Sequence, residues 1–161
     1  MTSEEVEEKL GLLEGYIERT SEMYRQLVNE QDSPIRLEYP SGSHYMCLQR
    51  QRDRNDNTVG LYWRVYYVVK TGQEAKSVWK KGWHPKKVPP SILRKMDDSN
   101  LSRFREQNEI AKAIHSAREQ LVKKKLRIMG TIQSFERDDP SRMEQAERLL
   151  DEFVLLKVSS G

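Results

Sequence analysis

The sequence predicts an α+β fold with an N-terminal amphipathic helix, a four-stranded antiparallel meander and a C-terminal helical hairpin spaced like a coiled coil. In residues 1–32 and 96–161, apolar side chains recur at alternating steps of three and four, which is typical of amphipathic helices. Residues 33–95 between them hold short segments rich in β-branched and aromatic side chains. Short turns join these segments, so neighbouring strands are expected to pair in chain order.

The first helix is expected over residues 3–31. Thr2 and Glu5 fit a capping box, and the glutamates of the first turn suit the positive end of the helix dipole. Gly11 and Gly15 each weaken the helix by about 1 kcal/mol. A second helix must therefore hold it, either from the same chain or from another copy in a homodimer. The heptad seam that would face this helix consists of Val6, Leu10, Leu13, Ile17, Thr20, Tyr24 and Leu27.

The middle block is expected to form strands at Ile35–Tyr39, His44–Arg50, Val59–Val69 and Glu74–Lys81. The turns between them are the segments PSGS, RDRNDN and KTGQ, which are rich in glycine, proline, asparagine and aspartate. In the third strand the odd positions are all apolar, which makes them the core face of the sheet.

The turn after the third strand decides which side chains share a face with that core. A three-residue loop, Lys70-Thr71-Gly72, places Trp79 opposite Trp63 in the core, whereas a two-residue turn places Trp79 on the outer face. We prefer the three-residue loop, because it buries Trp79 and leaves Lys76 and Lys80 in water.

Helical periodicity returns after the proline-rich segment that follows the sheet. One long helix is expected over residues 100–136, and a last helix begins with Asp139 as N-cap and Pro140 at the first helical position. The seam of the long helix consists of Ile110, Ile114, Ala117, Leu121, Lys124, Ile128, Thr131 and Phe135, and that of the last helix of Met143, Ala146, Leu150 and Phe153.

The charge of the chain is strongly uneven. Residues 1–32 carry a net charge of −6, residues 33–95 carry 13 basic and 4 acidic side chains for a net charge of +9, and residues 96–161 are neutral. The formal net charge of +3 therefore hides a basic middle block, which favours a polyanionic partner.

On the preferred register, basic and aromatic side chains share the outer face of the sheet. Lysine and arginine neutralise phosphates, arginine reads guanine, and tyrosine covers sugars or stacks on bases. The sequence therefore predicts double-stranded DNA binding with this face in the major groove. A solvated face that prevents aggregation is the alternative. The predicted DNA-binding residues are Arg50, Arg52, Arg54, Tyr62, Arg64, Tyr66, Lys76, Lys80, Trp83, Lys86 and Lys87.

No catalytic, metal or cofactor motif stands out in the sequence. Cys47 is the only cysteine, and His44, His84 and His115 lie in different predicted elements without metal-ligand spacing. Phosphate-binding glycine motifs and nucleophile motifs are absent, so we predict a protein that is not an enzyme. Without an apolar run of about 18 residues or a signal-peptide pattern, a cytoplasmic protein that does not bind membranes is expected.

The acidic first helix, the hairpin GLYWRVYYVVKTGQEAKSVWKKGW (residues 60–83) and the charged helical tail resemble the small auxiliary mobilisation proteins of the MobI type from conjugative plasmids and integrative elements. The resemblance implies a role at the origin of transfer, beside a relaxase or another DNA-processing protein, and it assigns no site residues. A three-stranded sheet followed by a helix also resembles the arm-type DNA-binding domains of phage integrases.

Two other functions remain open. The heptads would serve a protein-interaction adaptor that binds a partner helix, while its basic sheet meets an acidic protein. Alternatively, Tyr62, Tyr66 and Trp83 would form stacking platforms for single-stranded nucleic acid or RNA.

Overall fold

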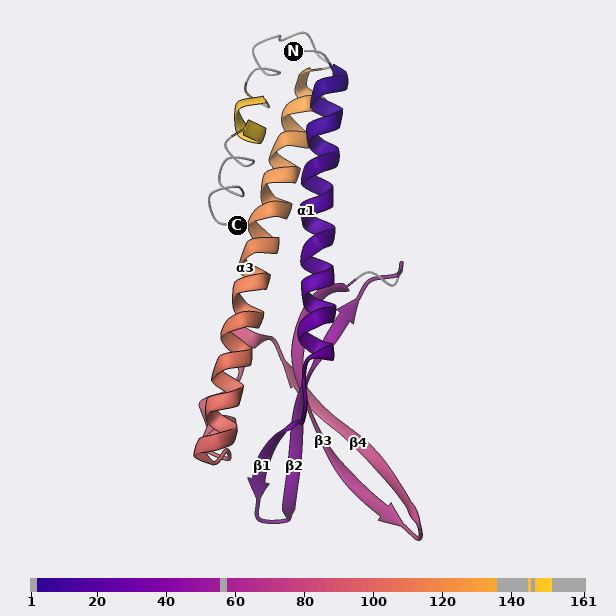
Figure 1. Cartoon of the computed structure of the whole chain (residues 1–161), viewed down its shortest axis with the longest axis vertical. Coiled ribbons are helices and arrows are strands. Elements are labelled where there is room, and N and C mark those ends of the chain that lie inside the picture. Colours follow the sequence, from indigo (N-terminus) through magenta and orange to yellow (C-terminus); the bar gives the residue numbers. More distant parts are fainter. Residues whose placement is uncertain (1–2, 56–57, 136–144, 146, 152–161) are drawn as a thin grey trace. The chain divides into compact units, whose positions relative to one another are not determined.

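The computed structural model describes residues 3–55, 58–135, 145 and 147–151 of the 161-residue chain. The α+β class is confirmed (Figure 1). The chain divides into two compact units: a helical unit, made of the described residues within 1–19 and 117–161, and a sheet unit, residues 20–116. The elements are α1 (Ser3–Asn29), β1 (Ile35–Tyr39), β2 (Gly42–Arg52), β3 (Thr58–Thr71), β4 (Glu74–Trp83), η1 (Pro85–Lys87), α2 (Pro90–Leu93) and α3 (Asp98–Phe135).

In the helical unit, the seam predicted for the first helix packs on the same chain. Val6 and Leu13 of α1 are buried with Leu121 and Ile128 of α3 and with Leu150. Ion pairs lie beside this core, from Lys125 to Glu14 at 3.1 Å and from Lys9 to Asp151 at 2.6 Å. The apolar seam of α1 is thus occupied in cis.

Parts of the predicted helix ends fall outside the described residues. This holds for Thr2 of the capping box and for Asp139 and Pro140, which were expected to start the last helix. Residues 145 and 147–151 are helical, as that prediction requires. Of the predicted seam of the last helix, Met143, Ala146 and Phe153 lie outside the described residues.

The sheet unit holds an antiparallel sheet in the strand order β1-β2-β3-β4, which confirms the predicted meander. One face of this sheet packs against Tyr24 and Leu27 of α1 and against α3. The prediction that Ile110 begins the seam of α3 is wrong, because Ile110 is 45% exposed. Ile114, Leu121 and Ile128 of the predicted seam are buried, and before Ile114 the inward positions are Phe104, Asn108 and Ala111.

Asn108 connects the sheet to the segment that leaves it. Its side-chain oxygen accepts a hydrogen bond from Trp63 Nε1 at 2.8 Å, and its side-chain nitrogen donates to the carbonyl oxygen of Pro85 at 3.1 Å. Trp63 is fully buried, and Asn108 and Pro85 are buried as well. One amide therefore satisfies two polar groups that water does not reach.

The preferred register of the last hairpin is wrong. Thr71 pairs with Glu74, so the turn has two residues, and Gly72 takes the positive φ of +69° that such turns require at their first central position. Tyr66 consequently lies opposite Trp79, which is on the outer face and 39% exposed.

A bulge in β4 brings a different tryptophan into the core. Between the pairs Tyr66–Trp79 and Arg64–Gly82, β3 has one residue and β4 has two, Lys80 and Lys81. Because side chains alternate with period two, the extra residue exchanges the two faces of β4. Trp83 therefore lies opposite Trp63 and packs against the core.

The far end of the β3–β4 hairpin, residues 68–81, is named the arm. It extends away from β1 and β2 in Figure 1. Its side chains are exposed on both faces of the two-stranded ribbon, except that of Val78, which is half-buried. The arm thus has the exposure of a free β-ribbon rather than of a strand pair inside a sheet.

Candidate nucleic-acid interface

The face of the sheet opposite the helices carries a group of polar and aromatic side chains, named the open face. Its residues are half-buried or exposed, whereas those of the other face, such as Met46, Trp63 and Val65, are buried. Alternation along three neighbouring strands brings them together. They are Tyr45, Cys47 and Gln49 of β2, Tyr62, Arg64 and Tyr66 of β3, and Trp79 of β4.

Three of these rings form a continuous strip across the strands. The ring centroids of Tyr45 and Tyr66 are 5.7 Å apart, and those of Tyr66 and Trp79 are 4.7 Å apart. Both pairs are direct cross-strand neighbours, Tyr45 with Tyr66 and Tyr66 with Trp79. Such pairs stabilise the sheet and present a nearly continuous aromatic surface.

Arg64 places one positive charge beside this strip. Its guanidinium carbon lies 5.1 Å from the ring centroid of Trp79, a cation–π contact, and its Nη1 lies 3.5 Å from Oε1 of Gln49. Among the described residues no carboxylate forms an ion pair with Arg64. Its charge is therefore held by neutral groups and stays available to an anion.

No protein-family model, curated protein or solved structure matches the chain.

Two ionisable groups of the open face, Cys47 and Tyr66, have raised pKa values. Burial raises the pKa of the Cys47 thiol, an effect that the charge of Arg64 opposes. Burial also raises the pKa of the Tyr66 hydroxyl, and the neighbouring Cys47 and Tyr45 add to this rise. Of the seven residues named for the open face, Arg64 is the one with a formal charge at neutral pH.

We expect the free energy of unfolding to fall as the pH rises above about 9, where the Cys47 thiol ionises in the unfolded chain. The folded state keeps the proton to higher pH than the unfolded state does, so raising the pH favours unfolding. Urea titrations between neutral and alkaline pH measure this slope. Cys47→Ala should make it shallower, and an identical slope in that variant would contradict the assignment.

Two lysines predicted to share the outer face with Arg64 lie on the other face. Lys76 is opposite Val69, and Lys80 Nζ lies 5.1 Å from the ring centroid of Tyr67. Both errors follow from the wrong register, since the two-residue turn reverses the faces of β4 as far as the bulge. Tyr62, Arg64 and Tyr66 lie on the open face as predicted.

The arginines predicted to extend the outer face do not do so. Arg50 lies opposite Leu61, a core residue, and follows His44, Met46 and Leu48 on the helix-facing side of β2. Arg52 and Arg54 are exposed at the end of β2 and in the turn after it, beyond a register shift. The alternation of His44, Met46 and Leu48 was the signal that would have placed Tyr45, Cys47 and Gln49 on the open face.

The predicted DNA contacts in the segment after β4 are exposed only in part. Trp83, predicted to touch DNA, packs against the core, whereas Lys86 and Lys87 are exposed in η1 as predicted. The backbone nitrogen of Lys86 donates to Nδ1 of His84 at 3.1 Å, which caps this short turn.

Two of the three histidines lie far apart in the sequence but are in contact in the structure. The rings of His84 and His115 meet edge to face with centroids 4.4 Å apart. In the described part of the chain, no group of three or more histidine, cysteine, aspartate or glutamate side chains is arranged to hold a metal ion. Within the same residues, no helix is both long and apolar enough to cross a membrane.

Proposed function

We propose that the sheet unit binds single-stranded nucleic acid on its open face. Bases would stack on the strip formed by Tyr45, Tyr66 and Trp79, and a phosphate would pair with Arg64. The strip, with a cation beside it that no described carboxylate neutralises, is the observation that carries the proposal. Each base stacked on an aromatic side chain contributes about 1 to 3 kcal/mol.

The positions of the lysines support this mode over the predicted one, in which the same face lies in the major groove. A duplex hides the flat faces of its bases and shows only their edges in the grooves. A sheet face that binds there also needs several cations for the two backbones. Lys76 and Lys80 lie on the opposite side of the ribbon from Arg64, so an aromatic surface with one arginine is better suited to unpaired bases.

Double-stranded DNA binding by the arm is the second candidate. The arm is exposed on both faces and carries Lys70, Lys76, Lys80 and Lys81 against the single acidic residue Glu74. A two-stranded β-ribbon fits the width of the major groove, about 12 Å. In this mode the lysines of both ribbon faces would meet the phosphates on either side of the groove.

Fluorescence anisotropy with a labelled oligothymidine of about 12 nucleotides tests the stacking proposal. Tyr66→Ala should raise Kd by about 5- to 100-fold, because it removes the central ring of the strip. Tyr67→Ala is the matched control, since Tyr67 is the next residue and lies on the other face. Its Kd should stay close to that of the wild type.

A duplex titrated under the same conditions separates the two candidates. If the arm binds DNA, the duplex should bind more tightly than the single strand. Lys76→Gln should then reduce the slope of log K against log salt by about 1. Equal losses in Tyr66→Ala and Tyr67→Ala would contradict stacking, and binding of neither nucleic acid would refute both candidates. The role in conjugative DNA transfer stays a prediction, which a mating assay with a deletion strain tests.

A further inference from the structure

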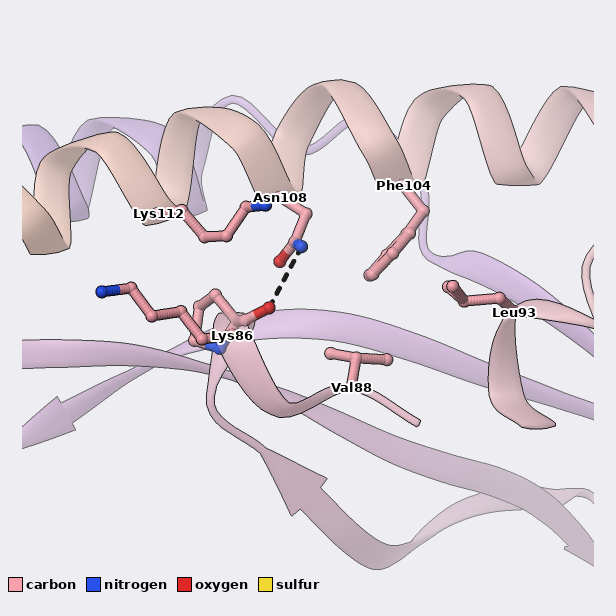
Figure 2. A pocket seen from close by; sticks show the side chains of 7 residues that line it. Lys86, Val88, Leu93, Phe104, Asn108 and Lys112 are labelled. Atoms are coloured by element: carbon pink, nitrogen blue, oxygen red, sulfur yellow. Dashed lines mark hydrogen bonds between the residues drawn. The ribbon is translucent and has the colours of Figure 1, made fainter. Parts of the chain in front are cut away.

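A pocket of about 470 Å³ lies between α3 and the segment that follows β4 (Figure 2). One part of its wall is apolar and consists of Val88, Leu93 and Phe104. Phe104 is buried, and Val88 and Leu93 are half-buried, so the wall is fixed by the core of the sheet unit. This volume and lining fit a small organic molecule with an apolar body.

The other part of the wall carries positive charge. Lys86 and Lys112 line it, and Figure 2 shows the end of the Lys112 side chain directed toward Asn108. Lys112 Nζ lies 2.6 Å from Glu109, whose side chain is 72% exposed. An exposed pair of this kind contributes little and is readily exchanged for another anion. Among the described residues, Lys86 forms no ion pair.

Asn108 lines the pocket with a side-chain amide that is only partly available to a bound molecule. Its side-chain amide is already engaged by Trp63 and Pro85. The charged groups of the lining are the two ammonium groups of Lys86 and Lys112, which donate and do not accept hydrogen bonds. The arrangement favours an anion over a neutral or cationic group of the same size.

We propose that this pocket binds a small amphipathic carboxylate. The carboxylate would pair with Lys112, with Lys86 adding a second positive charge to the lining, and an aromatic or branched body would cover Val88, Leu93 and Phe104. The inference does not depend on nucleic-acid binding, because the pocket and the open face share no residue.

Calorimetric titration of the whole chain with 2-naphthoate tests the proposal. Saturable binding at one site is expected. Lys112→Met should weaken it by about 10-fold, since it keeps the apolar stem and removes the charge that meets the carboxylate. Lys87→Met is the matched control, because Lys87 is the next residue of η1 after Lys86 and does not line the pocket.

Val88→Phe should abolish binding by filling the apolar part of the pocket. A melting curve recorded for each variant shows whether it is folded. If Val88→Phe fails to fold, the comparison of Lys112→Met with Lys87→Met decides the question. Equal binding of 2-naphthylmethylammonium, or equal affinity in the two lysine variants, would overturn the proposal. Oligothymidine binding should be unchanged in Lys112→Met, which keeps this test separate from that of the open face.

Discussion

Replacing Asn108 with leucine is expected to lower the free energy of unfolding by about 3 kcal/mol. The substitution leaves Trp63 Nε1 and the carbonyl oxygen of Pro85 buried without a hydrogen-bond partner. Each such group costs about 1 to 3 kcal/mol. Urea unfolding followed by tryptophan fluorescence measures the effect, because all three tryptophans of the chain belong to the sheet unit.

Gln107→Leu is the control for this experiment. Gln107 precedes Asn108 on α3 and is half-buried rather than buried. A change of its side chain should alter the free energy of unfolding by about 0.5 kcal/mol or less. If the two leucine variants lose the same stability, the loss reflects a general effect on the helix, and the bridging role of Asn108 is wrong.

The second large effect is expected for Gly82→Ala, which should lower the free energy of unfolding by about 2 kcal/mol. A Cβ at this position would lie 2.9 Å from the carbonyl oxygen of Trp63 and 3.0 Å from Cδ2 of Tyr62. The oxygen belongs to the backbone and can move only if β3 and β4 separate next to the bulge. Thermal and urea unfolding both measure this loss.

Gly60→Ala provides a matched comparison in the same sheet. Gly60 lies on the same face of β3 as Arg64, and a Cβ there would meet only Oε1 of Gln51, at an ordinary contact distance of 3.8 Å. Its effect should stay within about 0.5 kcal/mol. Equal destabilisation by the two alanines would show that the close approach at Gly82 is relieved without cost.

The long helices and the strands were predictable because each has a clear period, whereas η1 and α2 are too short to show one and were not predicted. The β1 strand matches its predicted bounds, and the heptad positions of α1 are buried or half-buried. The register of the last hairpin was not predictable in the same way. Trp79 and Trp83 are four residues apart, so in a regular strand they would share a face, and either could have been the partner of Trp63.

The candidate site was predictable where it depended on β3 alone. Tyr62, Arg64 and Tyr66 are spaced two residues apart in one strand. They therefore share a face whichever strands pair with β3. Lys76 and Lys80 were misplaced because their face depends on the turn, and Trp83 was misplaced because its face depends also on the bulge. The turn and the bulge each shift the pairing of β4 with β3 by one residue. The spacing of apolar side chains along a single strand does not reveal such a shift.

Because β4 has an extra residue at Lys80 and Lys81, side chains before and after this point alternate between the faces independently. Up to Trp79 the strand follows the alternation of the arm, and from Gly82 it follows that of the core. Substitutions in the arm can therefore change its surface chemistry while the packing around Trp83 is kept. Adding two residues to each strand of the arm would lengthen it by about 7 Å, and the side chains already there would stay on the same faces. Because of the bulge, mutations can thus change the length of the arm without altering the packing of the rest of the sheet.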